Sequence, residues 1–266
     1  MGVTIISGGT QGVGEAVART LAAGGSSGLI LGGRSRARGE SLATELTAAG
    51  TPSVFVRVDM ADPDAPQALV DACEQRLGTV HGVVNVAAAT SRATIWTDTP
   101  EHWDCMLAIN TRAPYFVIQA AARLMVRTGT AGSIVNVGSI SGYGGQPKLS
   151  AYSISKGALA VMTKNLAFAL MRHRIRVNQV NPGWMDTESE DLTQRTYEGA
   201  TDGWLARAEA TRPLGRLVKP WEVANAIAFC LSDDSGMMTG NCIDLDQSVQ
   251  GAGDPPIPSA AETPQP

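Results

Sequence analysis

The chain has 266 residues, of which 44% are hydrophobic and 17% charged, and its formal net charge is −4. This composition is typical of a globular protein with enough apolar residues for a substantial core. The acidic balance argues against a general nucleic-acid-binding protein, which usually has a basic excess. No apolar run reaches the ~18–20 residues that would span a bilayer, so we expect neither a nucleic-acid nor a membrane partner.

The N-terminus and the cysteines bear on the cellular compartment. The N-terminus lacks the basic segment and long apolar stretch of a signal peptide. The cysteines are scattered, with no pair at metal-ligand spacing (Cys73, Cys105, Cys230 and Cys242). We therefore expect a cytoplasmic protein with reduced thiols and no metal site.

Short apolar runs alternate with longer helical patterns along the chain. The runs predict strands at Val3–Ser7, Gly28–Leu31, Val54–Val58, Val83–Ala87, Ser133–Val137, Arg176–Val180 and Cys242–Leu245. Helical patterns lie near residues 14–23, 36–48, 64–77, 101–127, 150–172 and 220–231. Several runs are apolar throughout, which is typical of parallel strands buried on both faces. The alternation predicts one α/β domain over residues 1–250, a Rossmann-type, doubly wound parallel sheet of about seven strands with helices on both faces.

Two segments depart from this alternation. Residues 184–215 interrupt it and carry Trp184, Tyr197 and Trp204. Residues 251–266 are rich in proline, which cannot donate to a sheet, and hold few apolar side chains to bury. We expect this C-terminal segment to be a flexible tail.

The first predicted strand runs directly into a glycine-rich turn, Gly8-Gly9-Thr10-Gln11-Gly12-Val13-Gly14, and a helical pattern follows. Glycines allow a tight turn and a close approach of the backbone, and the helix presents free N–H groups to a pyrophosphate. The turn predicts a dinucleotide site, with an ordinary strand-to-helix connection as the alternative.

The end of the second strand bears on the choice of dinucleotide. An NAD site usually has an acidic residue here for the ribose 2′-hydroxyl. This chain has Gly33 at that place, followed by Arg34 and Ser35. A guanidinium suits a 2′-phosphate, so we expect NADP in preference to NAD. In the alternative interpretation, Arg34 stacks on adenine or faces water, and NAD is accepted.

A second motif indicates acid–base chemistry. Tyr152 and Lys156 are four residues apart, which places both on one face of a helix. A nearby ammonium favours the phenolate and would lower the phenol pKa from its usual value of ~10. Ser139 follows the strand at 133–137 and can hold a substrate oxygen against Tyr152, with Ser141 as a competitor. Asn110, a weak helix former within the long pattern at 101–127, is either a functional residue or a kink.

Together these motifs resemble the classical short-chain dehydrogenase/reductase family, and the resemblance extends to about residue 250. Ser7 stands where the family has Thr before the glycine turn, and Asn85-Val86-Ala87-Ala88 stands where it has N-N-A-G. The resemblance implies hydride transfer between a nicotinamide and a secondary alcohol or ketone. It implies that Asn110, Ser139, Tyr152 and Lys156 are catalytic, with Asn110 binding a water that links Lys156 to solvent.

The resemblance also implies a set of cofactor-binding residues. Asp59 would contact adenine, with a turn carboxylate as its alternative role, and Asn85 would either contact the cofactor or join neighbouring strands. The segment from Pro182 to Thr187 would pack on the nicotinamide. The full set is Gly8, Thr10, Gln11, Gly12, Val13, Gly14, Arg34, Ser35, Asp59, Met60, Asn85, Ala87, Tyr152, Lys156, Pro182, Gly183, Met185 and Thr187.

For the substrate, we expect contacts from Ser139, Tyr152 and Trp184, with Thr187–Gly215 as a lid. Several segments resemble bacterial members linked with sugar or polyol oxidation. Asp186, Glu188 and Arg92 would then bind hydroxyls, and Trp184 and Trp204 would stack on a sugar, unless these aromatic residues only pack the lid.

Two other classes of function compete with this interpretation. One is a non-catalytic dinucleotide sensor of the same fold, which would not need all four catalytic positions. The other is an epimerase or dehydratase, although such relatives usually have a longer C-terminal substrate domain. The helices predicted at 101–127 and 150–172 match the elements through which family members associate, so we expect a homotetramer or homodimer.

Overall fold

The computed structural model describes residues 2–250, so the predicted tail lies outside the described residues. Its sheet has seven parallel strands in the order β3-β2-β1-β4-β5-β6-β7. The strands are β1 (Val3–Ser7), β2 (Gly28–Gly33), β3 (Ser53–Arg57), β4 (Gly82–Asn85), β5 (Gly132–Val137), β6 (Ile175–Pro182) and β7 (Cys242–Leu245). The order reverses between β1 and β4, and such a switch point is where open α/β sheets bind ligands. The predicted fold class is confirmed.

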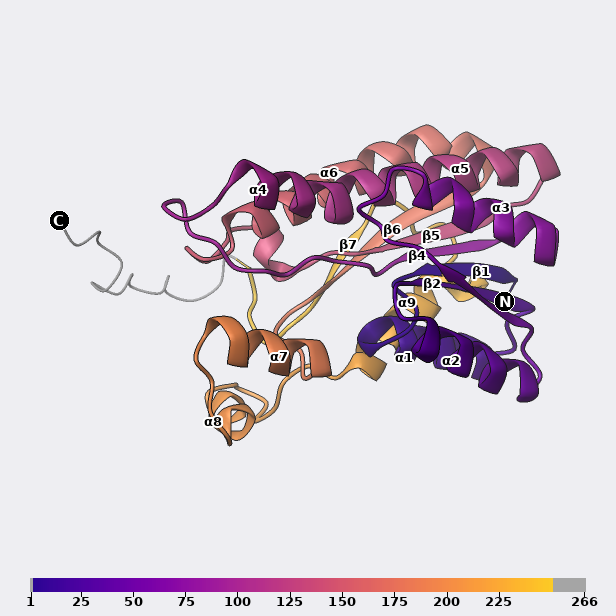
Figure 1. The fold of residues 1–266 in the computed structure, drawn as a ribbon. Coiled ribbons are helices and arrows are strands. Elements are labelled where there is room, and N and C mark those ends of the chain that lie inside the picture. Colours follow the sequence, from indigo (N-terminus) through magenta and orange to yellow (C-terminus); the bar gives the residue numbers. More distant parts are fainter. Residues whose placement is uncertain (1, 251–266) are drawn as a thin grey trace.

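Helices cover both faces of the sheet (Figure 1). One layer holds α1 (Gly12–Ala23), α2 (Arg36–Ala48) and α9 (Pro220–Leu231), and the other holds α3 (Ala65–Leu77), α5 (Ala113–Thr128) and α6 (Ser150–Leu170). The neighbouring residues Ile5 and Ile6 are both fully buried but belong to opposite cores. Two buried faces explain why the strand sequences are apolar throughout.

The helix predicted at 101–127 is not continuous. It consists of α4 (Pro100–Leu107), a π-helical turn over Ala108–Arg112, and α5. Pro114 has no N–H to donate to the carbonyl of Asn110 in the α-helical pattern, and the chain makes a wider turn there. Asn110 therefore lies in a local irregularity, as its weak helix propensity suggested.

The segment that interrupts the predicted alternation forms two short helices, α7 (Glu188–Tyr197) and α8 (Trp204–Ala210). Figure 1 shows both standing apart from the two main helical layers. They have a small core of their own around Trp204, Ala208 and Leu217. Within residues 2–250, the longest helices are too short or too polar to cross a membrane.

Candidate active site

The carboxyl ends of the strands open into a cleft of about 1080 Å³. It brings together most of the predicted site residues: Gly8, Thr10, Gln11, Gly12, Val13, Arg34, Ser35, Asp59, Met60, Ala87, Ser139, Tyr152, Lys156, Pro182, Gly183, Trp184, Met185 and Thr187. Of the predicted catalytic and cofactor-binding residues, Gly14, Asn85 and Asn110 are not among the lining residues. They lie behind the cleft wall, and their contacts show what they do there.

The glycine turn is built for close backbone approach. Gly8 has a φ of 78°, and a Cβ there would lie 2.7 Å from the backbone nitrogen of Ala87. A Cβ on Gly14 would lie 2.0 Å from the carbonyl oxygen of Gly8, so only glycine lets α1 start this close to the turn. Gln11, the N-cap residue, makes no side-chain hydrogen bond to the helix. The first-turn N–H groups are thus left for an anion, and the turn fits a dinucleotide pyrophosphate.

The end of the cleft beside the β2 turn carries an exposed cation, Arg34. Arg34 is exposed, lines the cleft, and makes no hydrogen bond or ion pair with any residue of the described chain. Ser35 caps α2 by accepting a bond from the backbone N–H of Arg38. One oxygen of Asp59 accepts the N–H of Ala61 at 3.0 Å, which is the turn role given as the alternative, and Asp59 also lines the cleft.

Asn85 belongs to a buried network of side-chain hydrogen bonds that crosses the sheet. Its amide nitrogen donates to Asn136 at 2.9 Å, and Asn136 donates to Thr163 at 2.9 Å. Gln179 accepts from the Thr163 hydroxyl at 3.1 Å and donates to Asn181 at 2.7 Å. The alternative role predicted for Asn85, joining neighbouring strands, is therefore what the structure shows. The other members of this network were not predicted, because single amides in apolar strands carry no local signal.

Asn110 connects the loop after β4 to α6 through hydrogen bonds. Its amide nitrogen donates to the carbonyl of Ala89 and to the Ser155 hydroxyl, both at 3.0 Å, and its oxygen accepts the Ala89 N–H at 2.8 Å. The residue is almost fully buried. The side chain is thus fully engaged in positioning, and the water relay implied by the resemblance stays a prediction.

Tyr152 and Lys156 share one face of α6, as predicted. The Lys156 Nζ lies 5.7 Å from the centroid of the Tyr152 ring and donates to the Val137 carbonyl at 2.7 Å. Burial lowers the pKa of Lys156 to about 8. The pKa of Tyr152 is raised, chiefly by burial, while Ser139 and Arg92 act to lower it. The Lys156 ammonium is bound to the Val137 carbonyl on β5 here, and the lowering of the Tyr152 pKa by Lys156 stays a prediction.

Ser139 lies at the end of β5 and caps the short turn Ile140–Gly142. Its Oγ accepts the N–H of Ser141 at 3.1 Å. The nearby Ser141 also lines the cleft. A side-chain hydrogen bond from Ser139 acts to lower the pKa of the Tyr152 phenol, so the two side chains lie close together. That Ser139 holds a substrate oxygen stays a prediction.

The substrate side of the cleft differs from the prediction in three residues. Trp184 lines it, but Trp204 is buried and stacks behind Trp184, with ring centroids 6.1 Å apart. Asp186 binds Lys219 at 2.8 Å, and Glu188 binds Arg38 at 2.8 Å. Neither carboxylate lines the cleft, so the expected hydroxyl contacts from these two residues are wrong. Each is drawn away by a cation that is distant in sequence.

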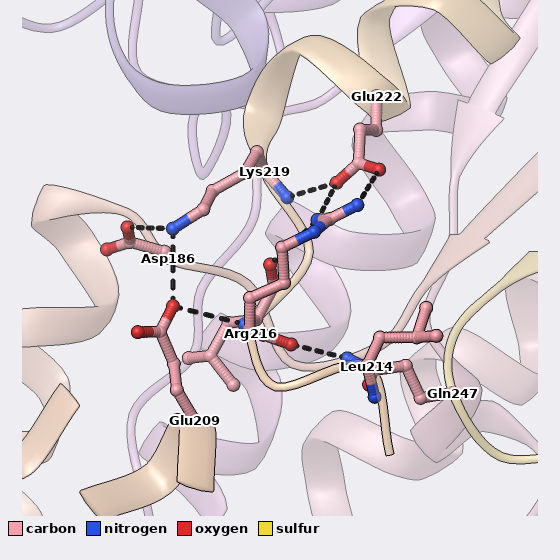
Figure 2. Close-up of polar contacts among 8 residues, drawn as sticks. Asp186, Glu209, Leu214, Arg216, Lys219, Glu222 and Gln247 are labelled. Carbon is pink, nitrogen blue, oxygen red and sulfur yellow. Dashed lines mark hydrogen bonds and ion pairs between the residues drawn. The ribbon is translucent and has the colours of Figure 1, made fainter. Parts of the chain in front are cut away.

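Figure 2 shows how the segment after α8 is attached to α9. Lys219 donates to the carboxylates of Asp186 at 2.8 Å and Glu209 at 3.3 Å. Arg216 makes two bonds with Glu222, at 2.6 and 2.7 Å. The pKa of Glu222 is lowered to about 2, chiefly by these bonds. Ion pairs therefore hold the base of the predicted lid.

Several residues that line the substrate side were missed. They are Lys148, Glu190, Gln194, Glu198 and Arg212, which join the predicted Arg92 and Trp184. Charged residues on helix ends and loops usually face solvent, so their sequence gave no reason to single them out. Within residues 2–250, no group of three or more His, Cys, Asp or Glu side chains is placed to hold a metal ion.

Comparison with known proteins agrees with this geometry. A family model described as enoyl-(acyl carrier protein) reductase matches residues 8–249. The 3-oxoacyl-(acyl-carrier-protein) reductase of Thermotoga maritima is 34% identical over 92% of this chain and 96% of its own length. The NADP-dependent (R)-specific alcohol dehydrogenase of Lentilactobacillus kefiri is 33% identical over 90% of this chain and 92% of its own. A short-chain dehydrogenase/reductase structure from Mycobacterium ulcerans superposes with a TM-score of 0.82, at 29% identity, and covers 92% of this chain and 88% of its own.

The parallel sheet, its glycine turn and the Tyr–Lys helix define a nicotinamide-dependent oxidoreductase. The chain belongs to the short-chain dehydrogenase/reductase family. Like its relatives, it is an oxidoreductase that acts on CH–OH donors with NAD(P).

Proposed function

We propose that this protein interconverts a secondary alcohol and its ketone, with Ser139, Tyr152, Lys156 and Asn110 as the catalytic set. The observation that carries this proposal is the meeting of Ser139, Tyr152 and Lys156 at the wall of one cleft. The bound nicotinamide would supply or accept the hydride. Residues Gly8–Gly14, Asp59, Met60, Ala87 and Pro182–Thr187 are proposed to hold the dinucleotide.

The side chains have distinct tasks. In reduction, Ser139 and Tyr152 hold the carbonyl oxygen and Tyr152 gives it a proton. Lys156 lies one helical turn away, with its ammonium on the Val137 carbonyl, and would bind the nicotinamide ribose of a bound dinucleotide. Its pKa of about 8 lets it exchange a proton near neutral pH. In oxidation the same groups act in reverse.

The cofactor preference is a second part of the proposal. Arg34 is a free guanidinium at the adenosine end of the cleft, and no acidic side chain precedes it at Gly33. This arrangement supports NADP over NAD, because a charged fork binds a 2′-phosphate well. One of the relatives, the Lentilactobacillus kefiri enzyme, is itself named as NADP-dependent.

The test is a steady-state assay of nicotinamide absorbance with sugars, polyols, cyclic ketones and secondary alcohols, using both dinucleotides. Turnover that Tyr152→Phe removes would support the reaction. Dinucleotide binding without any turnover would favour the sensor instead. Product formation without a net change in nicotinamide would favour an epimerase or dehydratase. The same panel tests whether the substrate is a sugar or polyol. Two side chains expected to bind its hydroxyls, Asp186 and Glu188, do not line the cleft.

We also propose that the protein assembles as a homodimer or homotetramer through α5 and α6. Phe116, Val161 and Phe168 are 42, 70 and 83% exposed on these helices. α5 and α6 also form an apolar groove, which is lined by Ile118, Ala122, Leu166 and Leu170 among others. Large exposed apolar patches mark association surfaces. Light scattering tests this, and a stable monomer at micromolar concentration would contradict it.

A further inference from the structure

The substrate side of the cleft contains a guanidinium group that is only partly paired. Arg92 lies in the loop after β4, and its side chain is 14% exposed. Its Nη1 donates to the Thr90 carbonyl at 2.8 Å. The carboxylate paired with it, Glu198, is 3.5 Å from Nε and is already held at 2.8 Å by the Lys148 ammonium. Arg92 and Lys148 therefore share one negative charge.

A second guanidinium lies on the same side of the cleft. Arg212 is 5.5 Å from the centroid of the Trp184 ring, and its Nε and Nη2 donate to the Thr211 hydroxyl. In the part of the chain that the structure describes, no carboxylate forms an ion pair with it. The lining carboxylate Glu190 is occupied by neutral donors, the Trp184 indole at 2.8 Å and the Gln194 amide at 2.8 Å.

The anionic side chains of the lining are already used by other donors. Glu198 is shared between Arg92 and Lys148, Glu190 accepts from Trp184 and Gln194, and Asp246 accepts the Ser248 N–H at 3.1 Å. Arg92 lies close to the chemistry, because its charge lowers the pKa of the Tyr152 phenol, against the charge of Glu190, which raises it. A partly buried cation without a full partner is costly, and a planar guanidinium with free N–H groups matches a carboxylate. The cleft is therefore complementary to an anion beside the reacting carbonyl.

We propose that the substrate is a hydroxy acid, or the corresponding oxo acid, whose carboxylate binds Arg92, with Arg212 as a second cation. This inference rests on the proposed function, because it takes Tyr152 as the proton donor. In reduction, the carbonyl carbon gains a hydride from the reduced dinucleotide, which becomes oxidised. The carbonyl oxygen gains the proton of Tyr152, and the carboxylate is unchanged. Trp184 lines the cleft beside Arg212.

The test compares each acid with its neutral ester. We would measure kcat/KM for 3- and 4-oxocyclohexanecarboxylate and for their methyl esters, with wild type and Arg92→Gln. Because a hydrogen bond to a charged group contributes ~1.5–3 kcal/mol, wild type should prefer the acid by about 10- to 100-fold. Arg92→Gln should lose most of that preference, because kcat/KM for the acid should fall while kcat/KM for the ester should change little. Arg92→Lys, which keeps the charge, should recover part of it.

The matched control is Arg195→Gln, which removes a guanidinium on α7 that pairs with Asp191 and Asp202 and does not line the cleft. It should change the acid-to-ester ratio little. A readout without turnover is calorimetric binding of cyclohexanecarboxylate, which carries no carbonyl, to the enzyme with oxidised dinucleotide. Arg92→Gln should weaken this binding by a similar factor.

Two outcomes would overturn the inference while the oxidoreductase reaction stands. One is a wild type that reduces the esters as well as the acids. The other is an Arg92→Gln variant that loses activity toward both equally and binds cyclohexanecarboxylate as wild type does. By contrast, failure of every alcohol and ketone to change nicotinamide absorbance would count against the proposed function, and the calorimetric comparison would still decide the role of Arg92.

Discussion

The floor of the cleft, where the strands end, and the predicted lid, Thr187–Gly215, are stabilised by different kinds of interaction. The floor is crossed by the buried network of amides and hydroxyls from Asn85 through Asn136 to Asn181. The lid is joined to the start of α9 by an ion pair between Glu209 and Lys219, whose side chains are 23 and 30% exposed. Neutral bonds in a buried network hold one geometry, whereas exposed ion pairs each contribute little and are screened by salt.

This difference suits the two tasks of the protein. Acid–base chemistry needs Ser139 and Tyr152 fixed within a fraction of an ångström. Substrate entry needs a segment that opens, and weak, separate contacts permit that. We therefore expect changes in the floor to affect folding or catalysis strongly, and changes in the lid attachments to have small, pH-dependent effects.

The largest effect should come from Tyr152→Phe. The ring is retained while the proton donor is removed, so kcat/KM should fall by ~10²–10⁴-fold or more. Dinucleotide binding, measured by calorimetry, should stay close to wild type. Ser141→Ala is the matched control, because that hydroxyl lines the cleft but is not assigned to the chemistry. Substantial turnover by Tyr152→Phe would contradict the mechanism.

The second-largest effect should come from Gly14→Ala, which places a side chain where α1 packs on the glycine turn. Its Cβ would lie 2.0 Å from the Gly8 carbonyl oxygen, so backbone must move. We expect a loss of ~1–3 kcal/mol in unfolding free energy, together with a loss of dinucleotide affinity. Gly144→Ala is the control, because nothing lies within 4 Å of its Cβ position. Equal stability and affinity for the two variants would show that the turn tolerates a side chain.

A smaller effect is expected at the adenosine end. Arg34→Leu should lower kcat/KM with NADP by about 10- to 100-fold and leave the value with NAD nearly unchanged. Gly33→Asp should shift preference toward NAD through its carboxylate. A Cβ at Gly33 would lie 2.8 Å from the Thr10 hydroxyl, so Gly33→Ala is the control for crowding alone.

Two results would contradict this interpretation of the β2 turn. The first is a wild type that prefers NAD by about tenfold or more. The second is equal behaviour of Gly33→Asp and Gly33→Ala, which would mean that the carboxylate has no influence on the dinucleotide.

Whether a site residue could be predicted from the sequence depended on whether its partners are near to it or distant in the chain. The glycine turn and the pair Tyr152 and Lys156 depend on residues close in sequence, so spacing alone predicted their place. The irregular turn within the helix predicted at 101–127 was anticipated only as a kink at Asn110, although Pro114 was a second usable signal. Asp186 and Glu188 were placed in the substrate site because nothing local shows that Lys219 and Arg38 hold them elsewhere. Side chains whose partners come from distant elements need the fold before they can be assigned.

The smallest expected effect concerns the lid attachment at Arg216. Its two bonds to Glu222 lower the pKa of that carboxyl to about 2, below the ~4.3 expected when unfolded. A lowered pKa means that the pair stabilises the fold fully above the unfolded value and loses this contribution as the pH falls toward about 2. Arg216 is 40% exposed, so solvent screening keeps the contribution of the pair small.

Urea unfolding of Arg216→Gln should therefore show this loss near neutral pH, and the gap to wild type should close as the pH is lowered through the acid range. High salt should narrow the gap as well. Arg36→Gln provides the control, because its pair with Glu40 is longer, at 3.5 Å, and more exposed. A deficit for Arg216→Gln that stays constant from neutral to acid pH would mean that Arg216 acts through packing, and the lid would then resemble the floor in what holds it.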